Sequence, residues 1–270
     1  RDSLPRRSRA HSRTRSRGRL RSARGRRVGR EVLRMNTSIV RRMWSLVAGF
    51  LRNTRVAQLR QMSEKKPRWI TGPLTLAALR LATESFASKP RKGGDTPYLS
   101  HLLAVSALVM EHGGTEVQSA GGLLHDAIED VKITADALTA RLVEYGASQA
   151  DAAAVAAIVE ACTDGTSDQK RDGKDWLKRK LEYLETLKAK RTSDQAMLVS
   201  LADKVHNIEA TLTEIRAGTT VEAFYGKPWF NARAPQQKWY YSALARVFSE
   251  KLGGNTEAKP LVERLTGAVD

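Results

Sequence analysis

From residue 74 onward, apolar residues recur at spacings of three and four, the pattern of helices that bury one face. This pattern predicts helices over residues 74–86, 101–111, 116–129, 135–145, 148–162, 176–188, 193–215, 234–251 and 261–268. Runs of alternating β-branched residues bounded by tight glycine turns, the usual signal of strands, are missing. The sequence therefore predicts an all-α, multi-helix fold in a single globular domain.

Glycine and proline separate the predicted helices, as expected for residues that end or interrupt regular structure. Examples are Gly93-Gly94 with Pro97, and Gly226-Lys227-Pro228. The longest polar connection covers residues 163–175. Such a segment is either a mobile lid or a solvated connection between two helices.

The charge of the chain is concentrated at its beginning. Of 46 Lys and Arg residues, 19 are arginines within residues 1–61, where only Asp2 and Glu31 are acidic. Residues 62–270 hold the remaining 27 basic and 27 acidic side chains. The net charge of +17 and the pI of about 10.3 therefore describe a basic extension, whereas the predicted domain over residues 62–270 is neutral.

Residues 1–61 are predicted to be a disordered basic extension, because residues 1–30 have too few apolar residues to offset the entropy of folding. An arginine-rich segment has three interpretations: a nucleic-acid-binding arm, a transit peptide, or a reading frame translated from too early a start. The absence of lysine favours the third, with Met35 or Met62 as the start. Residues 38–61 have the spacing of a short basic amphipathic helix.

Composition also indicates where such a protein works. The longest apolar runs fall far short of the roughly 18–20 residues that a membrane-spanning helix needs. We therefore expect that this chain is not an integral membrane protein. One cysteine, Cys162, cannot form an internal disulfide or a thiolate cluster. We interpret it as a small buried side chain in a helix of a cytoplasmic protein.

Three segments place ionisable residues on otherwise apolar sequence. His101 opens a helix after Pro97-Tyr98-Leu99-Ser100, and Asp203 follows the apolar segment 198–202. Between them, His125-Asp126-Ala127-Ile128-Glu129-Asp130 holds an imidazole and three carboxylates within six positions. Taken singly, His101 would be read as a helix cap and Asp203 as a buried ion-pair partner. Together, the four polar positions favour one shared site.

Helical spacing makes the middle segment informative. Residues four apart share a helix face, which would pair His125 with Glu129 and Asp126 with Asp130. Three carboxylates crowded onto little more than one turn repel one another unless a cation lies among them. Imidazole and carboxylate without thiolate suit Mn²⁺, Fe²⁺ or a similar ion better than structural zinc. The sequence therefore predicts a divalent metal site.

At these residues the sequence resembles the HD-domain phosphohydrolases, and within them the hydrolase domain of the RelA/SpoT homologues. The matching motifs, over about residues 70–252, are Arg91-Lys92-Gly93-Gly94-Asp95-Thr96-Pro97-Tyr98-Leu99-Ser100-His101, His125-Asp126-x-x-Glu129-Asp130, Leu201-Ala202-Asp203-Lys204-Val205-His206-Asn207, Trp176-x-x-Arg179-Lys180-x-x-Tyr183 and Trp239-Tyr240-Tyr241. As a whole, the sequence resembles a stand-alone small alarmone hydrolase, a protein with an HD-domain fold.

This resemblance implies hydrolysis of (p)ppGpp at its 3′-diphosphate to GDP or GTP and pyrophosphate, with Mn²⁺ or another divalent metal. It implies metal ligation by His101, His125, Asp126 and Asp203. It implies that Glu129 and Asp130 either position and deprotonate the attacking water or support a metal-bound hydroxide. It implies nucleotide contacts by Arg91, Lys92, Asn207, Arg179 and Lys180. A diphosphate leaving group needs positive charge rather than covalent catalysis, which agrees with a metal and basic residues.

Two rival hypotheses remain beside this one. The same scaffold and metal could act on another small-molecule nucleotide, such as NADPH with loss of its 2′-phosphate. Alternatively, function could lie in nucleic-acid binding by the arginine-rich extension. We expect nucleic acid not to be the partner, because every expected metal and catalytic position of the resemblance is filled.

Overall fold

The computed structural model describes residues 40–47, 67–163, 176–189 and 194–269. It divides into two compact units, residues 1–66 and residues 67–270, which are described separately. In the first unit, residues 40–47 form an exposed helical segment. The predicted disorder of residues 1–30, most of the polar connection 163–175 and the start at Met62 lie outside the described residues.

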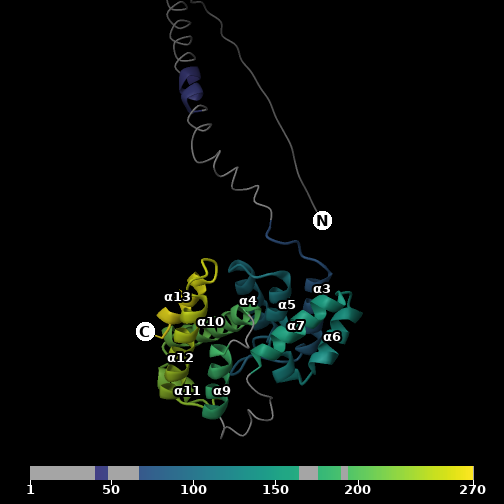
Figure 1. Cartoon of the computed structure of the whole chain (residues 1–270). Coiled ribbons are helices and arrows are strands. Elements are labelled where there is room, and N and C mark those ends of the chain that lie inside the picture. Colours follow the sequence, from purple (N-terminus) through teal and green to yellow (C-terminus); the bar gives the residue numbers. More distant parts are fainter. Residues whose placement is uncertain (1–39, 48–66, 164–175, 190–193, 270) are drawn as a thin grey trace, which may run out of the picture. The chain divides into compact units, whose positions relative to one another are not determined.

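In its described residues, the second unit consists of helices and the turns between them (Figure 1). They are α3 (Pro73–Ser85), α4 (Leu99–Glu111), α5 (Glu116–Leu124), η1 (Ala127–Val131), α6 (Ala135–Glu144), α7 (Gln149–Cys162), α9 (Trp176–Lys188), α10 (Asp194–Arg216), α11 (Val221–Tyr225), α12 (Ala234–Leu252) and α13 (Lys259–Gly267). Within the described ranges the only β pairing is an isolated bridge between Pro90 and Pro97. The predicted all-α fold is confirmed for these residues.

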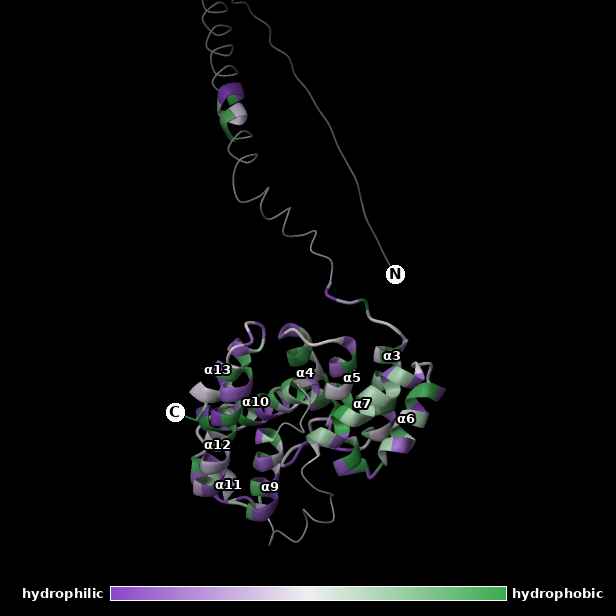
Figure 2. Ribbon diagram, in the orientation of Figure 1, coloured by the Kyte–Doolittle hydropathy of each residue, from purple (hydrophilic) through white to green (hydrophobic). Residues whose placement is uncertain are grey.

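Several helices begin where the sequence supplies a hydroxyl cap. Thr115 accepts a hydrogen bond from the Gln118 backbone, and the Gln118 side chain accepts one from the Thr115 backbone. Thr134, Ser148 and Thr220 cap α6, α7 and α11 with single hydroxyl contacts. Figure 2 shows hydrophobic and hydrophilic residues interspersed along the helices, as expected for helices that bury one face.

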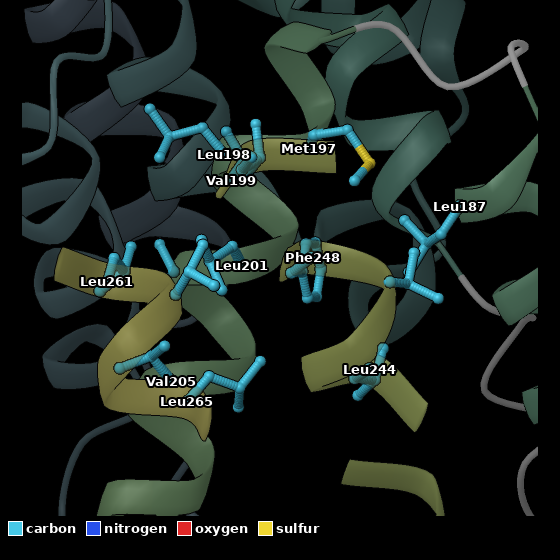
Figure 3. Close-up of a cluster of buried hydrophobic side chains, with 14 of the residues drawn as sticks. Leu187, Met197, Leu198, Val199, Leu201, Val205, Leu244, Phe248, Leu261 and Leu265 are labelled. Atoms are coloured by element: carbon cyan, nitrogen blue, oxygen red, sulfur yellow. The ribbon is translucent and has the colours of Figure 1, made fainter. Parts of the chain in front are cut away.

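Two hydrophobic clusters hold the helices together. The first core cluster, from α3 to α7, includes Phe86, Leu102, Leu124, Leu138 and Leu142. The second core cluster joins α9, α10, α12 and α13 and includes Leu187, Met197, Leu201, Leu244, Phe248, Leu261 and Leu265 (Figure 3). Helix α10 contacts α4, α5 and α7 as well as α11, α12 and α13. It therefore joins the two clusters, and polar residues on α10 can face residues of α4 and α5.

One predicted helix is wrong in its extent. The segment 116–129 is not one α-helix: α5 ends at Leu124, His125 and Asp126 form a turn, and η1 follows with π-helical geometry. The His125 imidazole Nδ1 lies 2.9 Å from the Gly122 carbonyl oxygen, an acceptor that a continuing α-helix would have used for its backbone. The left-handed backbone of Lys132 (φ 62°) ends the segment.

Helix α11 was not predicted, because its five residues are too short to show a periodic pattern. The described helices also include none with the length and hydropathy needed to cross a membrane.

Candidate metal centre and nucleotide cavity

Two imidazoles and one carboxylate meet at the junction of α4, α5 and α10. The Nε2 atom of His101 lies 3.2 Å from Asp203 Oδ1, and Nε2 of His125 lies 3.5 Å from the same oxygen. Potential ligand atoms of these three residues lie within 4.8 Å of one another, and all three residues are buried. The structure therefore brings together, from positions about 100 residues apart, three of the four predicted metal ligands.

The fourth predicted ligand, Asp126, lies beside this group. Its Oδ2 atom is 3.1 Å from His125 Nε2 and 3.6 Å from His101 Nε2. The Tyr98 hydroxyl donates a 2.5 Å hydrogen bond to the same oxygen. Burial and the Asp126 carboxylate raise the pKa of Tyr98 well above its usual range. Tyr98 therefore stays protonated and holds Asp126 in place.

Helix packing sets the position of His125. A Cβ atom on Gly122 would lie 3.1 Å from Ser106 Cα on α4, so glycine allows α4 and α5 to approach closely. This approach places the turn after α5 against His101 at the start of α4; the two ring centroids are 5.0 Å apart. The Gly122 carbonyl then accepts from His125 Nδ1, which turns Nε2 toward the carboxylates.

His101 is oriented by a different kind of partner. Its Nδ1 atom lies 2.8 Å from Nδ1 of His206, which is on α10 one turn after Asp203. Burial, His101 and Arg91 lower the pKa of His206 to about 4, so this imidazole is neutral at ordinary pH. Both imidazoles of the group thus use Nδ1 for support and present Nε2 to the carboxylates.

The carboxylates of the group are ionised. Burial alone would raise the pKa of Asp203, but Lys204 and the two imidazoles outweigh it and hold that pKa well below the usual range. In the same way, His125 and His101 outweigh burial and lower the pKa of Asp126. Burial works against protonation of His125, but Asp126 and Asp203 raise its pKa well above the usual value. The same carboxylates that attract a proton to His125 would attract a cation.

This donor set fits a divalent metal ion. His125 Nε2 is buried and, among the described residues, forms no hydrogen bond of acceptable direction, although Asp126 Oδ2 is close. A buried nitrogen without a well-directed hydrogen bond, flanked by two ionised carboxylates, is the arrangement that a cation would complete. Neutral imidazole and carboxylate oxygen are ordinary ligands of such ions.

The group opens into a cavity of about 910 Å³. Among the described residues, seven basic side chains line it: Lys89, Arg91, Lys92, Arg179, Lys180, Lys204 and Lys227. The described acids of the lining are Asp126, Glu129, Asp130, Asp203 and Glu214. With a divalent cation bound, positive charge would exceed negative charge among these residues, and such a cavity concentrates anionic ligands. Cys162 also lines the cavity and is half-buried, so our expectation of a buried cysteine is wrong in degree.

The predicted nucleotide-contacting residues all line this cavity. Arg91 donates a 3.0 Å hydrogen bond to Asn207 Oδ1, and Asn207 donates a 2.5 Å hydrogen bond to Asp203 Oδ1. Lys92 is exposed on the loop before α4. Arg179 is buried in the wall, and the Lys180 ammonium lies 4.8 Å from the Tyr240 ring centroid.

The predicted catalytic pair Glu129 and Asp130 lies on η1 and also lines the cavity. Asp130 forms an ion pair with Lys89, whose ammonium lies over the Tyr98 ring. The spacing argument that paired His125 with Glu129 on one helix face is wrong, because the α-helix ends before His125. Glu129 instead reaches the cavity from the π-helical segment.

Two features were missed by the sequence reasoning. His206 belongs to one of the matching motifs, but the sequence indicated no role for it. Its contact with His101 spans 105 residues, so no local sequence pattern could predict that contact. The aromatic residues 224–230 around α11 also line the cavity. Their clustering in one short segment was the signal that could have identified them.

The profile of the HD domain family matches residues 78–222, which is more than half of the chain. This range contains His101, His125, Asp126 and Asp203. The chain belongs to the HD domain family. Its fold is therefore that of the HD domain family, as the resemblance implied.

Relatives in other organisms match about half of the chain. A Xenopus tropicalis protein named guanosine-3′,5′-bis(diphosphate) 3′-pyrophosphohydrolase MESH1 is 32% identical over 139 residues, which cover 50% of this chain and 68% of that protein. A Synechocystis protein named probable guanosine-3′,5′-bis(diphosphate) 3′-pyrophosphohydrolase is 27% identical over 135 residues, which cover 50% of this chain. The chain spans only 16% of that relative's length.

A solved structure supports the fold. It is described as that of a metazoan orthologue of SpoT that hydrolyses ppGpp and plays a role in starvation responses. The two structures agree with a TM-score of 0.54 over 73% of this chain and 96% of the other, at 19% sequence identity. At this identity the likeness establishes a shared fold.

Proposed function

We propose that this protein hydrolyses (p)ppGpp at its 3′-diphosphate, releasing pyrophosphate and GDP or GTP, with Mn²⁺ as the metal. The observation that carries the proposal is the meeting of His101, His125, Asp126 and Asp203 at the wall of a cavity lined by basic side chains. The names of the vertebrate and cyanobacterial relatives support the choice of substrate.

The four residues would hold the metal through two imidazole nitrogens and two carboxylates. Four protein ligands leave coordination positions for water and a phosphate oxygen. A divalent cation bound there would neutralise charge on the diphosphate and make its phosphorus easier to attack. Nitrogen and oxygen ligands without thiolate support Mn²⁺ over structural zinc.

Glu129 is proposed as the general base. In the reaction, a water oxygen bonds to the phosphorus attached to the ribose 3′-oxygen, and the bond from that phosphorus to the 3′-oxygen breaks. Glu129 removes a proton from the water, and the 3′-oxygen gains a proton from solvent to leave as a hydroxyl. Asp130 is proposed to support this step by fixing Lys89, its ion-pair partner, at the cavity wall.

The basic residues would bind the rest of the nucleotide. Arg91 is held by Asn207 next to the Asp203 carboxylate, so its guanidinium is fixed close to the reacting diphosphate. Arg179 and Lys180 on α9 supply positive charge from another part of the wall. This division gives separate contacts to a nucleotide that carries phosphate groups on both its 3′- and 5′-oxygens. We place this activity in the cytoplasm, on the basis of the single cysteine.

The deciding experiment is the release of pyrophosphate from ppGpp by the full chain loaded with Mn²⁺. We expect equal amounts of pyrophosphate and GDP, no release after chelation, and recovery when Mn²⁺ is returned. His125→Ala should abolish release, whereas His112→Ala should not, because His112 contacts the Leu108 carbonyl away from the cavity. Wild-type protein that releases no pyrophosphate with Mn²⁺ present would overturn the proposal.

The rival hypotheses are separated with the same preparation. If the protein released phosphate from NADPH with a higher kcat/KM than it released pyrophosphate from ppGpp, NADPH would be the preferred substrate. The proposed metal site would be unchanged by that result. Removal of residues 1–61 should leave pyrophosphate release unchanged. A loss of activity on that removal would favour a role for the arginine-rich extension.

A further inference from the structure

One part of the cavity wall is aromatic and has no role in the reaction described above. Phe224, Trp229 and Phe230, which we call the aromatic wall, lie in α11 and the turn that follows it, and all three line the cavity. The Phe224 and Phe230 ring centroids are 5.1 Å apart, and those of Trp229 and Phe230 are 6.5 Å apart. The Lys227 ammonium lies 4.9 Å from the Phe224 ring and 5.6 Å from the Trp229 ring.

The aromatic wall touches the loop that carries Arg91 and Lys92. A Cβ atom on Gly93 would lie 2.5 Å from Cζ2 of Trp229, so the indole packs directly against the glycine backbone. Gly93 also has a φ of 83°, which favours glycine. Since Arg91 contacts Asn207 and Asn207 contacts Asp203, a continuous series of contacts runs from the metal ligands to Trp229.

Packing alone does not account for the exposure of these rings. Tyr225, in the same segment, is 5% exposed and fills a core position. Trp229 remains 37% exposed at the cavity, with a cation beside it. An exposed aromatic face next to phosphate-binding charge is how proteins hold a nucleobase, because every base has a flat apolar face that stacks.

We propose that the aromatic wall binds the purine base of the nucleotide by stacking, chiefly on Trp229. This inference rests on the proposed function in taking a nucleotide as the ligand. The charged residues hold the phosphates near the metal, and the base extends along the Arg91–Gly93 loop to the indole. The aromatic wall thereby selects for nucleotides over small phosphate anions.

The test is equilibrium binding to full-length, Mn²⁺-loaded protein without turnover, with GDP and inorganic pyrophosphate as probes. Trp229→Ala should weaken GDP binding about 5- to 150-fold, the range for loss of one stacking side chain, and should leave pyrophosphate binding unchanged. Trp229→Phe should retain most of the GDP affinity. Trp239→Ala is the matched control, because Trp239 is 40% exposed but does not line the cavity. UDP should bind less tightly than GDP.

The outcomes separate this proposal from the proposed function. Equal GDP binding by wild type and Trp229→Ala, or equal losses of GDP and pyrophosphate binding, would overturn base stacking; the second result would mean that the indole only supports the loop. Absence of GDP binding to wild type would also overturn it. If GDP binding depends on Trp229 while ppGpp is not hydrolysed, the base site stands and the proposed reaction fails.

A second inference concerns His206 and follows from the hydrogen bond to His101. A neutral imidazole that presents the lone pair of Nε2 to a metal carries its proton on Nδ1. In His125 that proton goes to a backbone carbonyl, but in His101 it faces Nδ1 of His206 at 2.8 Å. His206 must therefore accept at Nδ1 and carry its own proton on Nε2.

The geometry points to His206 as a positioning residue that fixes the tautomer and the ring orientation of His101. Groups that orient metal-bound imidazoles influence metal affinity strongly when they are removed. Folding brings His206 next to His101, since His206 lies on α10 and His101 lies on α4. Its effect is exerted through His101 and does not require contact with the substrate.

Mn²⁺ affinity of the full chain, measured by competition with a chelating dye, tests this role. His206→Leu, which cannot accept a hydrogen bond, should lose about 10- to 100-fold in affinity. His206→Gln keeps an acceptor oxygen and should stay within about 3-fold of wild type. Unchanged affinity in His206→Leu, or equal loss in both variants, would overturn the assignment.

A second measurement tests the same assignment on the wild-type protein, so it does not depend on whether a variant folds. Nitrogen-15 spectra of the Zn²⁺-loaded wild type, labelled at histidine, should show His101 protonated at Nδ1 and His206 unprotonated at Nδ1. The reverse pattern, with the shared proton on His206, would overturn the assignment.

Discussion

The residues proposed to hold the metal and those proposed to bind the nucleotide lie at the same cavity but are held in different ways. His101, His125 and Asp203 are 1%, 3% and 6% exposed and lie where helices of the two core clusters meet. Arg91, Lys92 and Trp229 lie on connections between helices and are half-buried or exposed. On the proposed assignment, helix packing would fix the geometry of the metal site, whereas nucleotide selection would depend on loops that can change without loss of the fold.

The largest expected effect comes from removing a buried ligand. Asp203→Ala should lose Mn²⁺ binding and pyrophosphate release together, because the imidazoles then lack the carboxylate between them. In wild type, Mn²⁺ at 100 times its Kd should raise the unfolding free energy by about 2.7 kcal/mol, and the variant should show no such increase. Thermal unfolding with and without Mn²⁺ measures this, with the exposed Asp136→Ala as control. A variant that is still stabilised by Mn²⁺ would contradict the assignment of Asp203.

The next effect separates catalysis from metal binding. Glu129→Gln should keep Mn²⁺ affinity and lose about 10²- to 10⁴-fold in kcat, the usual contribution of a general base. Metal titration and steady-state kinetics on one preparation measure both quantities. Glu214→Gln alters another acid of the same cavity and should leave kcat unchanged. Equal loss in the two variants would indicate a general effect of cavity charge.

A smaller effect is expected on the nucleotide-binding side. Arg91→Met should raise the KM for ppGpp about 10- to 100-fold, as expected for loss of a hydrogen bond between charged groups, while Mn²⁺ affinity is retained. The exposed Arg246→Met in α12 is the matched control. If Arg91→Met abolished metal binding instead, the hydrogen bond from Arg91 to Asn207 would be required for metal binding, and the assignment of Arg91 to nucleotide binding would be wrong.

The smallest effect should come from Lys180. Its ammonium lies over the Tyr240 ring, and contacts of this type at partly exposed positions contribute about 0.5–1 kcal/mol. Because this contact already engages the ammonium, we expect its attraction for the substrate to be that of a partly exposed charge pair, so Lys180→Ala should change kcat/KM only about 2- to 5-fold. Steady-state kinetics at two ionic strengths would show the difference shrinking as salt increases. A change as large as that for Arg91→Met would place Lys180 in direct contact with a phosphate group.

Residues close in sequence were predicted better than residues that only the fold brings together. Apolar periodicity located the long helices, since it reports which face of each helix is buried. It failed after Leu124, where the His125 side chain takes a carbonyl that the backbone would have used. A pattern of residue types does not reveal a competition for one acceptor.

For this protein, the sequence alone determined the helical class, the location of the charge excess and the identities of the polar residues inserted into apolar helices. Only the tertiary structure decided that His101 and His206 share a hydrogen bond, and that Trp229 packs against Gly93. The reason is physical: a helix is specified by contacts within a few residues, whereas a binding site is specified by distances between helices that depend on how whole faces pack.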